Sequence, residues 1–286
     1  MRDPFFEPPL ALVQAAQPLA NSLALRTLPL HVHEILPAFC VYQFFESAVA
    51  PPLSQYLFPK SYSKLSKRTR RNWDIHFVSF VQSCFINGVA LWVMYADKER
   101  NQMDWRERVW GYSGAIGMVQ GFTTGYFIWD FVTCAKDVAM HGPGALAHSI
   151  SALAVSLLGF RPFVNYHGLN FVLYELSTPF LNIHWFLDKL DMTGSTLQWY
   201  NGAILIVTFG TSRLVWGSYA TIRLYQDVRR AIQSTQELPV PTWLAVAYLA
   251  STAVFTGLNF YWFAKMIKTI RSRFDKPRQV PDRKDD

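Results

Sequence analysis

The polar residues best suited to chemistry lie in one mostly apolar run, residues 163–187. The run is long enough to cross a lipid bilayer, yet it carries a carboxylate, an amide and an imidazole, from Glu175, Asn182 and His184. Placing an acidic group at mid-membrane costs about 2.5–3.5 kcal/mol on insertion scales. A segment that only anchored the protein would have no use for Glu175, so we predict a function for these side chains.

Helical spacing places four residues of this run on one face, because Glu175, Thr178, Asn182 and Trp185 follow one another at i, i+3, i+7 and i+10. Pro179 lacks a backbone N–H and clashes with the preceding turn, so a kink or local unwinding is expected there. Two interpretations remain open. The face is either a polar seam between helices or the wall of a polar cavity for a lipid headgroup or reactive group, and we favour the cavity.

The composition is that of a membrane protein in its distribution more than in its average. The chain has 286 residues, of which 51% are hydrophobic and 16% charged, against about 25% charged in soluble domains. The apolar residues fall into seven blocks, and the net charge of +7 lies in short segments beside them. This pattern indicates an anionic membrane surface as the partner and argues against nucleic acid. The three cysteines lie within apolar blocks and show no metal-ligand spacing.

The apolar blocks predict an all-α fold, a polytopic membrane bundle of about seven transmembrane helices in one domain. Residues 1–27 are proline-rich and predict an irregular or interfacial segment, and residues 273–286 predict a flexible basic tail. Pro51 and Pro52 should break the helix near the end of the first span, residues 97–108 and 226–241 should be polar loops, and Arg213 lies inside the sixth span. The predicted spans are 28–58, 73–96, 109–135, 145–160, 163–187, 199–220 and 242–267.

The segment 60–71 gives the strongest topology signal, since it holds six basic residues and no acid. A loop this basic belongs in the cytosol. Seven spans then place the C-terminal tail in the cytosol too. The same count puts Arg223, Arg229 and Arg230 on the lumenal side, against the usual bias, and an additional re-entrant segment would repair it.

Several further positions in the spans are candidates for packing or chemistry. Gly117 and Gly121 have the small-xxx-small spacing that lets helix backbones approach closely. Asp130, near the cytosolic end of the third span, has either an interfacial role or a role in the site. His31 and His33 are two residues apart, which splays them on a helix, so we expect no metal site.

Several of these stretches together resemble the TLC-domain family, which includes ceramide synthases and less understood lipid-related membrane proteins. The resemblance covers about residues 73–268, and we place the domain at 66–272. Its most specific carrier, residues 175–186, looks like the branch outside the ceramide synthases. The stretches that carry the resemblance are 73–79, 125–130, the region of His148, 175–186 and 258–265.

The chain departs from the family pattern in the fourth span, where the family usually shows adjacent histidines and this chain has His148 and Ser149. In ceramide synthases that pair is associated with acyl transfer from acyl-CoA to a sphingoid amine. His76 and His184 stand where relatives tend to carry arginine. Losing one histidine weakens the case for catalysis, because a nucleophile needs an activating base within reach.

The resemblance and the residues lead to two hypotheses. The first is an endoplasmic reticulum protein of lipid homeostasis that sets membrane lipid composition and binds a lipid or acyl chain in a polar-lined intramembrane cavity, without a cofactor. The alternative is an acyl-CoA-dependent N-acyltransferase resembling ceramide synthase, with acyl-CoA as co-substrate. In that case His148 is nucleophile or general base, Glu175 or Asp130 orients it, and Asn182 holds the carbonyl.

The remaining expectations concern partners and location. Membrane lipids are the expected partners, and the chain could pair with itself or with another membrane protein. Lys284, third from the end, loosely resembles a retrieval signal for the endoplasmic reticulum on a cytosolic tail. The residues expected to contact the substrate are His76, Tyr126, Ser149, Thr178, Asn182, His184 and Trp185.

Overall fold

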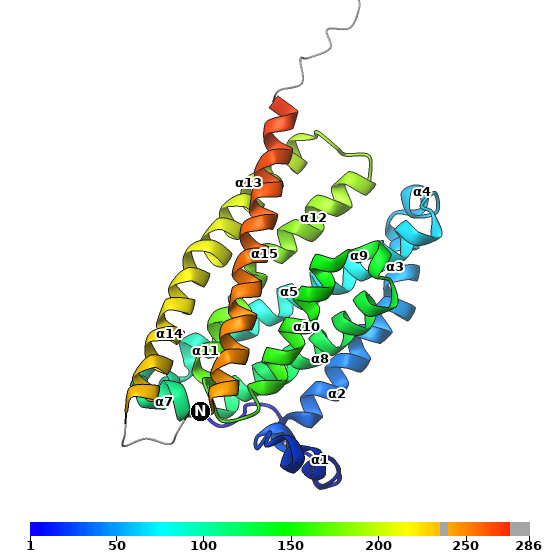
Figure 1. The fold of residues 1–286 in the computed structure, drawn as a ribbon. Coiled ribbons are helices and arrows are strands. Elements are labelled where there is room, and N and C mark those ends of the chain that lie inside the picture. The colour runs from blue at the N-terminus through cyan, green and yellow to red at the C-terminus, as the bar shows by residue number, and fades with distance from the viewer. Residues whose placement is uncertain (235–239, 275–286) are drawn as a thin grey trace, which may run out of the picture.

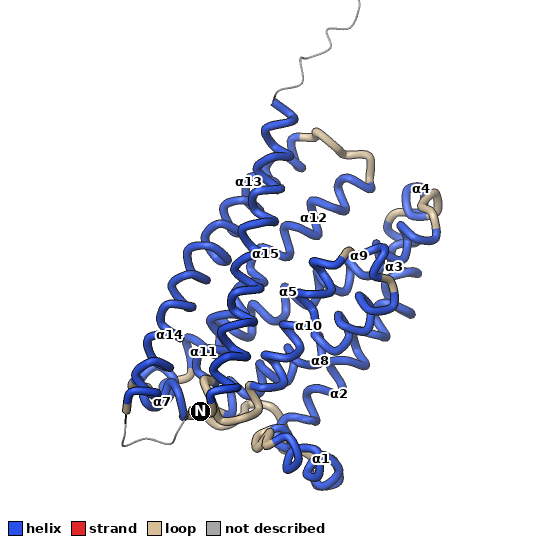
Figure 2. The backbone as a smooth tube through the Cα atoms, viewed as in Figure 1, coloured by secondary structure: helices blue, strands red, loops and turns tan. Residues whose placement is uncertain are grey.

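The computed structural model describes residues 1–234 and 240–274, with side chains placed through residue 270. Every regular element in these residues is a helix, which confirms the all-α prediction (Figure 2). Two helices are long and apolar enough to cross a membrane by themselves, Lys67–Ala96 and Thr242–Ile270. The count of about seven spans therefore stays a prediction. Lys284 and the rest of 275–286 lie outside the described residues.

The helices follow one another with short connections, as Figure 1 shows. Helix α8 packs against both α2 and α10, α5 packs against α12, and α15 packs against α10. The α-helices are α1 (Leu10–Leu23), α2 (Leu28–Phe44), α3 (Ala50–Leu57), α4 (Pro59–Tyr62), α5 (Lys67–Ala96), α6 (Lys98–Gln102), α7 (Trp105–Trp110), α8 (Gly114–Lys136), α9 (Val138–His141), α10 (Pro143–Leu158), α11 (Asn165–Val172), α12 (Thr178–Lys189), α13 (Thr196–Phe209), α14 (Gly217–Gln233) and α15 (Thr242–Phe274).

Two π-helices join pairs of these α-helices into longer helical paths. A π-helix, Phe45–Val49, joins α2 to α3, and a second, Gly210–Trp216, joins α13 to α14. The regular helix predicted to break at Pro51 and Pro52 is interrupted just before them by the π-helix, and α3 then carries both prolines in its first turn and ends at Leu57. Both prolines follow directly after the π-helix, where the regular hydrogen-bond pattern is already interrupted, so their missing N–H groups break little.

Three predicted boundaries also need correction. Residues 97–108 hold two short helices, α6 and α7, where a loop was expected. Helix α14 continues through Gln233 because Leu224, Val228 and Ala231 recur at helical spacing and are buried. Helix α15 reaches Phe274, beyond the predicted start of the tail at residue 273.

The fifth predicted span is interrupted where its proline predicts it. Helix α11 ends at Val172, a 3₁₀ segment covers Leu173–Ser177, and α12 begins at Thr178 with Pro179 in its first turn. The expected unwinding before Pro179 is therefore confirmed. A 3₁₀ segment has about 3.0 residues per turn instead of 3.6, so it changes the directions in which side chains on either side of it point.

The small-xxx-small prediction is confirmed at the contact between α8 and α2, which we call the glycine seam. A Cβ atom at Gly117 would overlap the His31 ring, and one at Gly121 would overlap the Glu34 carboxyl group. A third glycine, Gly125, faces the backbone oxygen of Ile35. Only glycine leaves room for α2 at this distance, so the seam accommodates both backbone and polar side chains of α2.

Candidate functional site

A hollow, which we call the central cavity, lies among α5, α8, α10, α11, the 3₁₀ segment, α14 and α15. Its volume is ≈ 1080 Å³, its open mouth included. Most of its wall is apolar, with aliphatic and aromatic side chains such as Ile86, Val119 and Phe255. His148 and Glu175 both line it, so the two candidates singled out from the sequence face one space.

Glu175 owes its position to Arg213, a residue to which the sequence analysis gave no role. Arg213 lies in the π-helix Gly210–Trp216 and is buried. Its Nη2 is 3.9 Å from Glu175 Oε1, its Nε donates to Ser177 Oγ at 3.0 Å, and Nη2 donates to Thr178 Oγ1 at 3.1 Å. A guanidinium cannot lose its proton in a protein, so burial requires such partners. The sequence signal was a lone arginine inside an apolar span.

His148 presents an imidazole to a largely aromatic surrounding. Its ring centroid lies 5.5 Å from Phe255 and 5.7 Å from Trp262 of α15, both edge-on. Its Nδ1 is buried and has no hydrogen-bond partner among the described residues. Ser149, the second position of the expected histidine pair, does not line the central cavity. Its hydroxyl group donates to the Leu146 carbonyl at 3.0 Å.

Asp130 does not line the central cavity. It lies on α8 beside Cys134, whose Sγ is 3.9 Å from Asp130 Oδ1, and it is an electrostatic neighbour of Tyr126 and Glu175. Tyr126 is buried in an aromatic cluster, 5.4 Å from the Tyr42 ring. Of the two candidate residues on the cavity wall, Asp130 therefore interacts electrostatically with Glu175 and not with His148.

The face predicted from helical spacing divides at the 3₁₀ segment. Glu175 turns to the central cavity, Thr178 accepts from Arg213, and Asn182 and Trp185 turn to α5. The reason is the narrow 3₁₀ turn, which ends the regular α-helical register assumed for the whole run.

The contact between α12 and α5 is a polar and aromatic seam. His76 Nδ1 and Asn182 Oδ1 are 2.7 Å apart, and Asn182 Nδ2 donates to Ser79 Oγ at 3.1 Å. The His76 ring stacks on Trp185 with centroids 4.1 Å apart. His184 faces α13 instead, close to Gly202. None of the predicted substrate-contacting residues His76, Asn182, His184 and Trp185 belongs to the wall of the central cavity.

A second histidine on the cavity wall escaped the sequence analysis. His167 is buried, and its Nε2 lies 3.2 Å from Asp227 Oδ2 on α14. Asp227 also accepts from Arg108 Nε at 2.7 Å and from Arg108 Nη2 at 3.0 Å. These hydrogen bonds stabilise the ionised form of the buried Asp227 carboxyl group.

An ionised Asp227 fixes the state of the histidine beside it. Nε2 of His167 donates its proton to the carboxylate, which leaves Nδ1 as the lone-pair nitrogen. That Nδ1 is buried without a hydrogen-bond partner among the described residues. No sequence pattern could have found this arrangement, because Arg108, His167 and Asp227 come from three helices far apart in the chain.

These features define an all-helical protein whose longest helices suit a membrane and whose interior holds a largely apolar cavity with few polar groups. The TLC domain profile matches residues 72–268. The chain belongs to the TLC-domain family, as its resemblance indicated, and members of this family are membrane-associated.

Several relatives resemble this chain over most of their length. An uncharacterised TLC domain-containing protein of Schizosaccharomyces pombe is 39% identical over 266 residues, which are 93% of this chain and 87% of the relative. Topoisomerase I damage affected protein 4 of Saccharomyces cerevisiae is 31% identical over 86% of each chain. TLC domain-containing protein 4 C of Dictyostelium discoideum is 27% identical over 80% of each chain.

Proposed function

We propose that this protein is a multi-pass membrane protein of the endoplasmic reticulum that binds a lipid or acyl chain in the central cavity and acts in lipid homeostasis. One observation carries the proposal. A hollow large enough for part of a lipid has an apolar wall and receives His148, Glu175 and His167 at its surface. An acyl chain matches the apolar wall, and a headgroup matches the polar groups.

The proposal includes about seven transmembrane spans. Helical paths through the two π-helices, 28–57 and 196–233, each exceed the roughly 20 residues that a bilayer requires. Large apolar side chains face outward along the second of these paths. In water such a surface would favour aggregation, whereas lipid chains would cover it. The exposed residues concerned are Trp199, Val207, Val215, Ile222 and Ile232.

The polar groups of the cavity suit recognition of a headgroup that carries both donors and acceptors. Glu175 and Arg213 compensate each other in charge, and the arginine already donates to Ser177 and Thr178. Glu175 therefore remains as an acceptor at the cavity surface. We infer that a hydroxyl or amine of the lipid donates to Glu175 while its chain occupies the apolar part.

The alternative function, an acyl-CoA-dependent N-acyltransferase, is favoured by one observation, the orientation of His167 by Asp227 on the cavity wall. In that reaction the amine attacks the thioester carbonyl, the N–C bond forms, and the C–S bond breaks. A histidine base takes the amine proton and returns it to the departing thiolate. His167 has an orienting carboxylate, whereas His148 has none among the described hydrogen bonds.

Binding can be tested with a variant that fills the cavity. Ala152 of α10 is buried and lines the cavity, whereas Ala147 of the same helix is exposed. We expect purified wild-type protein in mild detergent to retain lipid detectable by mass spectrometry, A152F to lose it, and A147F to keep it. Equal retention in all three proteins would contradict binding in this cavity.

Turnover separates the two functions. The same protein, with H148A and H167A variants, is incubated with a long-chain acyl-CoA and a sphingoid base, and the amide product is measured. We expect no turnover by any of these proteins, and cells without the protein should show altered lipid profiles. Amide formation that H167A or H148A abolishes would establish the acyltransferase instead.

A further inference from the structure

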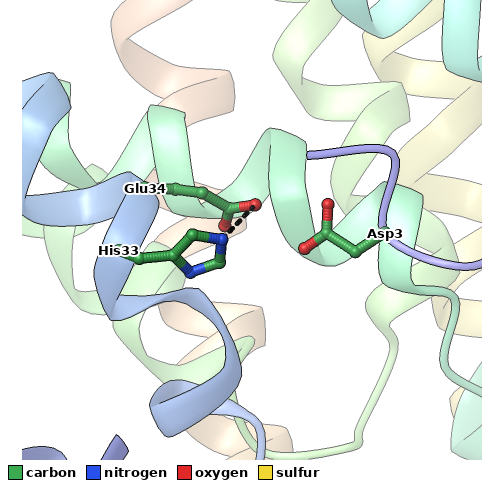
Figure 3. A group of neighbouring side chains, drawn as sticks. All are labelled: Asp3, His33 and Glu34. Atoms are coloured by element: carbon green, nitrogen blue, oxygen red, sulfur yellow. Dashed lines mark ion pairs between the residues drawn. The ribbon is translucent and has the colours of Figure 1, made fainter. Parts of the chain in front are cut away.

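A second group of polar residues lies away from the central cavity, where the N-terminal segment meets the start of α2. Figure 3 shows the side chains of Asp3, His33 and Glu34 facing one another. Their ligand atoms all lie within 4.8 Å of one another. His33 is 1% exposed and Glu34 is 0% exposed, so these two side chains are shielded from solvent, whereas the side chain of Asp3 is partly exposed.

The buried polar atoms of this group lack partners. Neither ring nitrogen of His33 has a hydrogen bond among the described residues, and the same holds for Glu34 Oε1. His33 Nε2 lies 3.9 Å from that oxygen, too far for a hydrogen bond. A buried polar group without a partner costs roughly 1–3 kcal/mol, so three such atoms on two adjacent residues require an explanation.

The other oxygen of Glu34 is held firmly. His31 Nδ1 lies 2.7 Å from Glu34 Oε2, and the opposite ring nitrogen of His31 bonds the Tyr112 hydroxyl. The glycine at 121 provides the space in which the carboxyl group lies. This fixed oxygen and its unpaired neighbour give Glu34 the geometry of a carboxylate that is oriented by a second group while one oxygen is kept for a ligand.

The charges point in the same direction. Asp3, whose side chain is 24% exposed, and Glu34 are two carboxyl groups in contact, and His31 Nδ1 lies 3.4 Å from Asp3 Oδ2 as well. Two carboxylates this close repel each other unless a proton or a cation lies between them. The rings of Phe5 and Phe6 cover His33, with centroids 5.7 and 4.9 Å away, and exclude water as an alternative partner on that side.

We propose that Asp3, His33 and Glu34 bind a divalent transition-metal ion of the Zn²⁺ class. One imidazole nitrogen with two carboxylate oxygens is a donor set that Zn²⁺ accepts, with a fourth position left for water or another donor. His31 is a positioning residue that orients Glu34 and does not itself bind the ion. The ion would join the N-terminal segment to α2 and neutralise both carboxylates.

The sequence analysis expected no metal because His31 and His33 point in different directions on a helix. The two histidines do point in different directions, as expected, but this does not exclude a metal site. His31 turns to Tyr112 and Glu34, and the additional ligands come from the adjacent Glu34 and from Asp3, which lies in the N-terminal segment before α1. A search for histidine pairs could not find a site of this composition.

The test is zinc titration of the purified full chain in detergent, followed by calorimetry and by metal analysis after dialysis. We expect about one Zn²⁺ per wild-type chain, with affinity at least tenfold lower in D3N, H33Q and E34Q. H31Q, which removes the positioning contact, should weaken binding by about 10–100-fold. E46Q, a change of another glutamate in the same helical path, should leave binding unchanged.

Two outcomes would overturn the site. Folded wild-type protein that binds no zinc would mean that the carboxyl pair is held by a shared proton. Unchanged stoichiometry in all three ligand variants would place the zinc elsewhere. E34Q keeps the shape of the side chain, and monodisperse elution of each variant confirms that it is folded. The wild-type stoichiometry decides the question even if a variant does not fold, and neither outcome affects lipid binding in the central cavity.

Discussion

The two sides of α8 differ in how closely they pack against their neighbours. Toward α2, the glycine seam brings two helices so close that even a methyl group at Gly117 or Gly121 would overlap a side chain. Toward α10 and the 3₁₀ segment, the same helix borders a hollow of ≈ 1080 Å³. The contrast indicates that one half of the bundle is a rigid support and that the other half has room for a molecule the chain does not supply.

The polar residues follow the same division. On the seam side His31 bonds Tyr112, and unpaired polar atoms lie in the compact group of Asp3, His33 and Glu34. On the cavity side the unpaired nitrogens of His148 and His167 belong to residues spread along a wide wall. A compact group of donors suits an ion, whereas separated polar groups on an apolar wall suit a long amphipathic molecule.

The largest effect should come from the ion pairs of Asp227 with Arg108 and His167 at the edge of the cavity, a group that we call the clamp. Changing Asp227 to Ala leaves Arg108 and His167 without their acceptor in a buried position. Removing one partner of a buried ion pair costs about 3–5 kcal/mol, and we expect a corresponding loss in thermal unfolding of the detergent-solubilised protein.

The matched control for this change is Asp188, whose pair with Lys189 is exposed. We expect D188A to change stability by less than about 1 kcal/mol, as is usual for a surface pair. An equal and small loss in both variants would mean that the clamp does not hold α7, α11 and α14 together.

A pair of glycine substitutions tests the contrast across α8 directly. G121A should destabilise the protein by about 1–3 kcal/mol, because the new methyl group displaces Glu34 from a closed space. Gly168 lines the cavity, and nothing lies within 4 Å of a Cβ placed there. G168A should therefore be neutral or stabilise α11 by up to about 1 kcal/mol. Comparable losses at both positions would remove the distinction between a tight side and an open side.

The sequence predicted the helical class, the close approach at Gly117 and Gly121, and the unwinding before Pro179, because each follows from local chemistry. It also placed Glu175 and His148 at one cavity. It could not foresee that Asn182 and Trp185 turn toward α5, since Pro179 predicts an interruption of the helix but not the directions of the side chains beyond it. Arg108, His167 and Asp227 meet only through the packing of three helices, which spacing along one helix does not encode.

The smallest predicted effect decides the role of Asn182. Its hydrogen bond with His76 should contribute about 0.5–1.5 kcal/mol, measurable as the coupling energy in a double-mutant cycle of H76F and N182A. The aromatic ring in H76F keeps the stacking on Trp185. If Asn182 only joins α12 to α5, N182A loses this coupling and still retains lipid. Lipid loss without a change in stability would return Asn182 to the binding site, and the cavity would then have to extend past the 3₁₀ segment toward α5.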